Sequence, residues 1–210
     1  NKDAIQNTFK VKADEASGAL TFEYPIELPE GRNGMIPNIG FTYNSQNTSN
    51  EYILGYGWTM SIPYIERVNK KGVDRLYVEN YFTSSLSGEL TTSTLVDTTH
   101  GEYISRVSSG ENLKYIFNEN NSWSVYTKEG QIYTFGQSVD SKQTNENDTK
   151  TYKWMVERIE DVNGNSMYFE YTKETGQIYP SRITYTNIEN ESGIYEVNFT
   201  YESREDDLKM

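Results

Sequence analysis

The sequence predicts an all-β fold built from antiparallel hairpins. Apolar and polar residues alternate with a period of two in several segments, and this spacing places the apolar side chains on one face of a half-buried strand. Tyrosine, which favours pleated surfaces, is abundant at 18 of 210 residues. No segment longer than about ten residues has the apolar spacing of an amphipathic helix.

The clearest pair of strands lies near the N-terminus. Residues 21–28 alternate without interruption, residues 38–44 repeat the pattern, and turn-forming residues separate them. Gly31 and Gly34 can adopt positive φ without a Cβ clash, and Asn33 tolerates it better than most residues. The pattern predicts a β-hairpin with a glycine-rich corner.

A second corner follows this hairpin. Gly55 and Gly57 flank a tyrosine just before Trp58, and Trp58 shares its side of the strand with Met60 and Ile62. Two glycines next to a large ring indicate a tight bend where backbone approaches backbone. We therefore expect Trp58 to be an anchor of the core.

The remaining strands follow from the same alternation. A short strand is expected at residues 8–13, and the serine- and threonine-rich segment 76–97 is less regular. Residues 138–150 are polar apart from Val139, which predicts a loop open to proteolysis. The other expected strands are 64–68, 103–107, 113–117, 122–126, 131–135, 152–159, 167–171, 183–185 and 195–201.

Four pieces of the N-terminal region form a pattern of fixed order and spacing. They are Tyr24-Pro25-Ile26, Pro29-x-Gly31-Arg32-Asn33-Gly34-Met35-x-Pro37, Tyr43-Asn44-Ser45 and Leu54-Gly55-Tyr56-Gly57-Trp58. Together they resemble the N-terminal domain of the SpvB family, which includes virulence-plasmid B proteins and the B component of bacterial ABC (Tc) toxin complexes. We expect these residues to be structural, and expect the planar fork of Arg32 to fix loop carbonyls or a carboxylate.

One internal repeat lies in the C-terminal half. Residues 126–133 recur as residues 171–179 with one insertion. A wider pattern in this region resembles a YD (Rhs) repeat, and its members are Asp161-x-x-Gly164-Asn165, Tyr168, Tyr171 and Gly176. The resemblance implies that each repeat is a hairpin and that stacked hairpins form a curved sheet, part of a YD/Rhs-type shell.

The two resemblances suggest a division of the chain into four parts. Residues 1–68 are expected to form an SpvB-like N-terminal β unit, 69–137 a β-hairpin region, 138–150 a polar loop and 151–210 a YD-like β-hairpin region. The chain is expected to be a fragment of a longer protein.

Composition excludes several function classes. Lys and Arg number 19 against 31 Asp and Glu, so the net charge of −12 repels phosphate and disfavours nucleic acids and anionic membranes. The absence of cysteine excludes disulfides, thiolate zinc sites and thiol nucleophiles. No run approaches the ~18 apolar residues of a membrane span.

The sequence offers little for catalysis or metal binding. His100 is the one imidazole, no nucleophile-elbow motif accompanies it, and a zinc site needs more nitrogen or sulfur ligands than it supplies. Asp161, Asn163 and Asn165 imitate the first ligands of a calcium loop, but the later positions do not fit, with Thr172 at the twelfth. We predict no catalytic, cofactor-binding or metal-binding residues.

Three functions remain open. The resemblance implies a non-catalytic structural module of a secreted or cell-surface toxin protein, part of a β shell around a toxin cargo. Its partners would then be the rest of its own polypeptide, the encapsulated toxin segment and other toxin-complex subunits. The alternative is a cell-surface adhesion module that binds carbohydrate or protein through exposed tyrosine and tryptophan. A glycosidase using carboxylate pairs, Glu157 with Asp161 or Asp206 with Asp207, ranks last.

Overall fold

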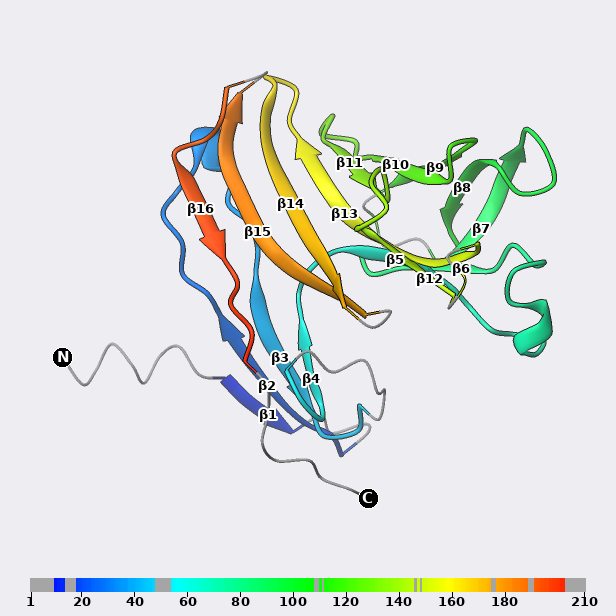
Figure 1. Ribbon diagram of the computed structural model, residues 1–210, viewed down its shortest axis with the longest axis horizontal. Helices are drawn as coiled ribbons and strands as arrows, with labels where there is room; N and C mark the ends of the chain where they lie inside the picture. The colour runs from blue at the N-terminus through cyan, green and yellow to red at the C-terminus, as the bar shows by residue number, and fades with distance from the viewer. Residues whose placement is uncertain are drawn as a thin grey trace.

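The protein consists of two antiparallel β-sheets in the computed structural model (Figure 1). The structure describes residues 10–13, 18–47, 54–107, 110, 112–145, 147, 149–174, 177–188 and 191–202. Within these residues the helical segments are two short 3-10 turns, η1 (Arg32–Gly34) and η2 (Val73–Arg75). No helix in the described part of the chain has the length and apolar character needed to cross a membrane. The all-β prediction is confirmed.

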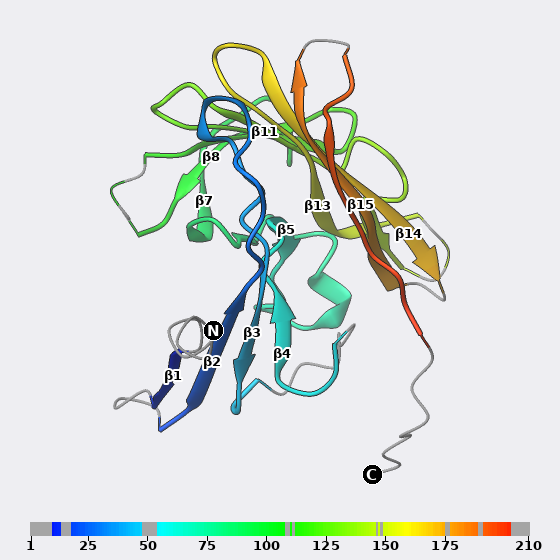
Figure 2. The same cartoon turned by 90° about the vertical axis from the view of Figure 1, so that its left-hand side faces the viewer.

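The smaller sheet contains four strands in chain order. They are β1 (Lys10–Ala13), β2 (Leu20–Pro25), β3 (Gly40–Asn44) and β4 (Trp58–Met60). Strand β2 ends at Pro25 rather than at residue 28, because the chain there turns away from the sheet. The connection 26–39 leaves the small sheet and runs alongside the larger sheet toward its far end (Figure 2).

The larger sheet has twelve strands joined mainly by consecutive hairpins. They are β5 (Tyr64–Arg67), β6 (Phe82–Ser84), β7 (Gly88–Leu95), β8 (Gly101–Ser105), β9 (Lys114–Asn118), β10 (Ser122–Tyr126), β11 (Ile132–Phe135), β12 (Lys142–Thr144), β13 (Thr151–Glu160), β14 (Asn165–Glu174), β15 (Gln177–Ile188) and β16 (Tyr195–Asn198).

Strand β13 closes part of this sheet into a ring. Its first half pairs with β5, where Trp154 lies opposite Ile65, and its second half pairs with β11, where Ile159 lies opposite Tyr133. The hydrogen-bonded path therefore runs from β5 through β6, β7, β8, β9, β10 and β11 to β13 and back to β5. Strands β14, β15 and β16 extend from the ring as a curved leaf, visible at the upper left of Figure 1.

Aromatic side chains fill the core of the ring. Phe117 stacks on Trp123 with ring centroids 4.4 Å apart, and Phe82 meets Trp123 edge-on at 5.0 Å. Such pairs add to the stability that burial of their large apolar area already supplies. Among the apolar residues of the ring strands β5–β11 and β13, those at most 2% exposed are Ile65, Phe82, Tyr103, Tyr115, Phe117, Trp123, Val125, Phe135, Trp154 and Val156.

Arg67 covers one side of this aromatic core. Its guanidinium carbon lies 4.8 Å from the centroid of the Phe82 ring, and its nitrogens donate to the carbonyl oxygens of Thr151 and Glu79 at 3.2 and 3.1 Å. Burial lowers the pKa of Arg67. The carbonyl contacts replace part of the hydration that the cation loses.

Two segments differ from their sequence-based expectation. Residues 64–68 were expected to end the first unit, but β5 pairs with β6 and β13 in the larger sheet. The polar segment 138–150 contains β12, which pairs with β13. The pairing of β5 with β13 joins residues far apart in sequence, and the polarity of residues 138–150 hides the short β12–β13 hairpin, so local alternation reveals neither. The four-part division of the chain stays a prediction.

Candidate functional site

The N-terminal glycine-rich turn and the β13–β14 turn meet at one end of the larger sheet. Nδ2 of Asn33 donates a hydrogen bond to Oδ2 of Asp161 at 3.2 Å, across 128 residues of sequence. We call this contact, formed by Asn33, Asp161 and Asn165, the clasp. It joins a residue of the SpvB-like motif to residues of the YD-like motif, which sequence analysis had treated separately.

The backbone of the glycine-rich turn shapes one side of the clasp. Asn33 and Gly34 have φ of 54° and 72°, in the left-handed region that Asn and Gly tolerate best. The N–H of Met35 donates to the carbonyl of Arg32 at 3.0 Å and closes the turn. Gly31 can adopt positive φ but does not use it here, because its φ is −87°. Glycine is required there by close approach, since a Cβ would clash with the carbonyl oxygen of Met35.

The carboxylate of Asp161 organises the other side. Its Oδ1 accepts from the backbone N–H groups of Asn163 and Asn165 at 2.8 and 3.0 Å, and its Oδ2 accepts from Nδ2 of Asn165 at 2.8 Å. Burial opposes ionisation, but the hydrogen bonds from Asn165 and Asn33 outweigh it and lower the pKa of Asp161. Gly164 completes the turn with φ of 80°.

A second contact holds the same connection. The hydroxyl of Tyr185, a residue only 1% exposed, donates to the carbonyl of Pro29 at 3.1 Å. The neighbouring Thr186 has φ of 68°, which is rare for a β-branched residue, and lies at an irregularity of the β14–β15 pairing. Such bulges change the direction in which a strand points its side chains. Here the irregularity accompanies the contact between β15 and the N-terminal connection.

Two further predicted residues belong to the YD-like motif on β14. The ring of Tyr168 faces the guanidinium carbon of Arg158 at 5.5 Å. Tyr171 is buried on the opposite face, its hydroxyl donates to the carbonyl of Val156 at 2.5 Å, and burial raises its pKa well above the usual value. Gly176 lies outside the described residues.

Arg32 does not perform the task expected of it. Its side chain is exposed, and it has no hydrogen-bond or ion-pair partner among the described residues. Asn33, the next residue, makes the contact instead.

The β10–β11 and β13–β14 turns are structurally equivalent, which was not expected from the sequence. In the β10–β11 turn, the N–H of Gln131 donates to Oγ1 of Thr127 at 3.1 Å, just as Asn165 donates to Oδ1 of Asp161. Gly130 has φ of 85° and occupies the place of Gly164. The two turns share a sequence pattern, a polar residue followed by two others and a glycine, which is Thr127-x-x-Gly130 in one and Asp161-x-x-Gly164 in the other. The repeat identified from sequence aligned residues 126–133 with 171–179 instead.

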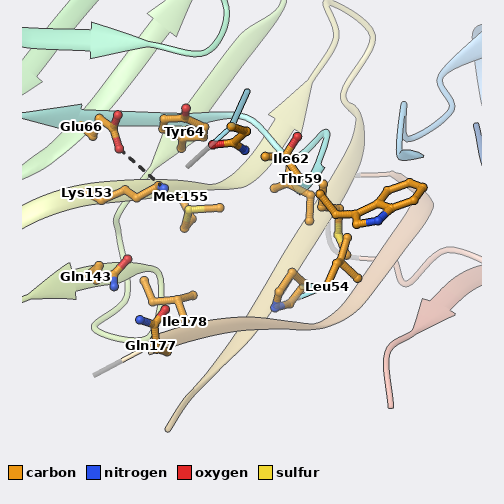
Figure 3. A pocket seen from close by; sticks show the side chains of 14 residues that line it. Leu54, Thr59, Ile62, Tyr64, Glu66, Gln143, Lys153, Met155, Gln177 and Ile178 are labelled. Atoms are coloured by element: carbon orange, nitrogen blue, oxygen red, sulfur yellow. Dashed lines mark ion pairs between the residues drawn. The ribbon is translucent and has the colours of Figure 1, made fainter. Parts of the chain in front are cut away.

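A pocket of about 560 Å³ lies between β4 and the start of β15 (Figure 3). Glu66 and Lys153 form an ion pair of 3.6 Å on one wall, and the ammonium of Lys153 lies 4.1 Å from the centroid of the Tyr64 ring. The apolar residues of the lining are Leu54, Trp58, Met60, Ile62, Met155, Ile178 and Pro180. The pocket therefore combines a polar wall with an apolar floor and sides.

Trp58 lines this pocket and is not a core anchor. It is half-buried and stands outside the main core cluster, so the expectation is wrong. Its ring packs on Phe22 and Tyr43 of the small sheet, with centroids 5.8 and 5.4 Å apart. Gly57 allows this packing, because a Cβ there would lie 2.6 Å from the Tyr43 ring. Gly55 has φ of 98° in the same corner.

The imidazole of His100 and the carboxylate of Glu157 are both engaged in hydrogen bonds. Nδ1 of His100 lies 2.7 Å from Oδ2 of Asp97, and this bond with two backbone N–H groups lowers the pKa of Asp97 to about 2. Glu157 accepts from the N–H groups of Gln137 and Ser138. Asp206 and Asp207 lie outside the described residues. No cluster of three or more His, Cys, Asp or Glu side chains suited to a metal occurs in the described ranges.

The fold defines the class of the protein as an all-β module of the kind present in bacterial Tc toxin structures. The crystal structure of TcdB2-TccC3 matches with a TM-score of 0.71 and 22% identity, over 88% of this chain and 10% of that chain. The Photorhabdus luminescens Tc holotoxin pore matches with a TM-score of 0.71 and 21% identity, over 84% and 10%. The chain thus spans about a tenth of the length of these toxin chains.

A smaller structure matches over most of its length. The N-terminal domain of the effector SpvB from Salmonella typhimurium strain LT2 has a TM-score of 0.63 and 19% identity, over 81% of this chain and 66% of that chain. The family described as Salmonella virulence plasmid 65kDa B protein, SpvB, matches residues 14–204, and the chain belongs to this family. No curated protein matches the sequence.

Proposed function

We propose that the chain is a non-catalytic structural module of a secreted Rhs/Tc-like toxin protein and forms part of a β shell that encapsulates a toxin segment. In the part of the chain that the structure describes, β16 pairs only with β15, and its open edge carries this proposal. The N–H of Phe199 donates to the carbonyl of Ser181 at 3.0 Å, so the alternation of the ladder directs the main chain of Glu196 and Asn198 away from β15. An open edge with apolar side chains packed on the core is suited to receive the next strand.

The partners follow from this arrangement. The rest of the chain's own polypeptide would pair with β16 and continue the shell, and the toxin segment would lie inside it. Other toxin-complex subunits are the remaining partners, and the site of action is outside the cell or on its surface. The net charge of −12 argues against nucleic acid as a partner.

The test joins the chain to the longer polypeptide proposed to follow it, with its toxin segment. Asn198→Pro removes an outward N–H from β16 while sparing the β15 ladder, and Asn198→Ala is the matched control. We expect the toxin segment to resist protease in the wild type and the control, and to be cleaved faster in the proline variant. Equal protection in all three would contradict a shell that continues through β16.

One observation favours the adhesion alternative. The small sheet presents a half-exposed aromatic face, in which Tyr24 stacks on Phe41 at 6.3 Å and Trp58 packs on Tyr43. Aromatic faces of this kind stack on sugars. A glycan array with the wild-type chain separates the two functions, since a shell module is expected to bind no glycan and an adhesion module at least one.

Absence of catalysis is part of the proposal. In the described part of the chain no serine or threonine hydroxyl bonds the imidazole of His100, so the pair with Asp97 lacks a nucleophile. We expect no turnover on a panel of glycosides, esters and peptides. Turnover abolished by replacing a single carboxylate would establish an enzyme instead.

A further inference from the structure

Among the described residues β4 pairs only with β3, and its other edge borders the pocket of Figure 3. Strand β4 is the last strand of the small sheet, and all three of its residues line the pocket. Trp58 and Met60 point to one face of the strand and Thr59 to the other. A cavity lined by side chains from both faces lies at the edge of the strand, so the edge itself is accessible from the pocket.

The ladder shows which main-chain groups point into this edge. The N–H of Asn44 donates to the carbonyl of Gly57 at 2.8 Å, and the N–H of Ser61 donates to the carbonyl of Gly40 at 3.0 Å. Bonds toward β3 therefore come from positions 57, 59 and 61. Because an antiparallel ladder alternates, the N–H and C=O groups of residues 58 and 60 point away from β3.

Two of these four outward groups already have partners. The N–H of Trp58 donates to Gly55 at 3.2 Å, and the carbonyl of Met60 accepts from Ile62 at 2.9 Å. The carbonyl of Trp58 and the N–H of Met60 remain without a partner in the ranges that the structure describes. These two groups lie on either side of Thr59. In a parallel ladder, one residue of the added strand donates its N–H to the carbonyl before such a residue and accepts from the N–H after it.

The walls of the pocket suit an extended chain of varied sequence. Trp58 and Met60 lie on the β4 side, and Met155 and Ile178 come from β13 and β15 (Figure 3). Methionine is flexible and adapts to differently shaped neighbours, which favours broad recognition. Main-chain hydrogen bonds add affinity that does not depend on side-chain identity.

We propose that a stretch of the toxin segment docks in this pocket as an extended strand, parallel to β4. One of its residues donates its N–H to the carbonyl of Trp58 and accepts from the N–H of Met60, while its apolar side chains contact Met155 and Ile178. This inference rests on the proposed encapsulating function and names the place where the cargo main chain is held.

The experiment measures fluorescence anisotropy of a labelled peptide of alternating leucine and serine added to the 210-residue chain. Met60→Pro removes the donor at the open edge without removing a bond to β3, and Met60→Leu keeps the donor and the apolar side chain. We expect Met60→Pro to weaken binding about tenfold, the worth of one main-chain hydrogen bond, and Met60→Leu to leave binding unchanged. The same peptide N-methylated at every residue should bind the wild type no more tightly than the unmodified peptide binds Met60→Pro.

The N-methylated peptide is tested on the wild-type chain, so the experiment gives an answer even if Met60→Pro fails to fold. Equal binding of the two peptides, or no binding of either by the wild type, would overturn the proposal. A wild-type dimer in light scattering that Met60→Pro abolishes, with no peptide bound, would assign the edge to a second copy and also overturn it. Protease protection of the toxin segment in the longer protein tests the shell separately, so protection without peptide binding removes this inference and leaves the proposed function.

Discussion

Removing the carboxylate of Asp161 should unfasten the clasp. Asp161→Ala leaves four donors without their acceptor, namely Nδ2 of Asn33, the N–H of Asn163 and both the N–H and Nδ2 of Asn165. Asn165 is only 6% exposed, and a buried donor left unpaired costs about 1–3 kcal/mol. With Asn163 able to reach water, we expect the free energy of unfolding to fall by about 2–4 kcal/mol. Urea denaturation followed by tryptophan fluorescence measures the change.

A double-mutant cycle then isolates the link between the two turns. Asn33→Gly removes the amide and adds no backbone strain, because glycine accepts the φ of 54° found there. The bond of 3.2 Å joins a partly exposed amide to a carboxylate, so we expect a coupling of about 0.5–1.5 kcal/mol between Asn33→Gly and Asp161→Ala. Additive effects of the two substitutions would refute the clasp as an energetic link.

Three further predictions concern packing and pH. Trp123→Ala should destabilise the protein by about 3–5 kcal/mol and Trp58→Ala clearly less, since Trp123 is fully buried and Trp58 is half-buried; equal shifts in urea melts would contradict this. Gly31→Ala should cost about 1–3 kcal/mol because its Cβ clashes with backbone, and a melt equal to wild type would exclude the close approach. The pKa of Asp97 is lowered from 3.8 to about 2 in the folded protein, and that of Asp161 is also lowered. The stability that these two carboxylates contribute is fully present above their unfolded pKa and should be lost as the pH falls through their folded pKa. Thermal melts should show this decline, and Asp97→Asn should flatten it.

Local pattern predicted the hairpins well. The pairs β8–β9 and β10–β11 lie where alternation and turn residues placed them, and the buried face of β14, with Met167, Phe169 and Tyr171, matches the predicted period of two. These features depend on neighbours close in sequence, which is why a period of two and a glycine at the turn suffice to predict them.

Closure of the ring could not be predicted in this way. The pairing of Trp154 with Ile65 joins residues far apart in sequence, and nothing in either strand specifies its partner. The polarity of residues 138–150 also concealed β12, because a strand at a solvated edge needs no apolar run. Trp58 was misjudged for a related reason, since a large ring after a glycine corner fits a core or an exposed aromatic face equally well.

Strand β13 explains why the clasp and the pocket occupy fixed positions relative to each other. Its first residues pair with β5 and β12 and supply Lys153 and Met155 to the pocket, and its last residues pair with β11 and β14 and lead into Asp161. A ten-residue strand spans about 30 Å, and here both of its edges are hydrogen-bonded. A strand paired on both edges cannot tilt without breaking ladders on each side. Strand β13 therefore holds the clasp at one end of the larger sheet and the Lys153 and Met155 side of the pocket at the other.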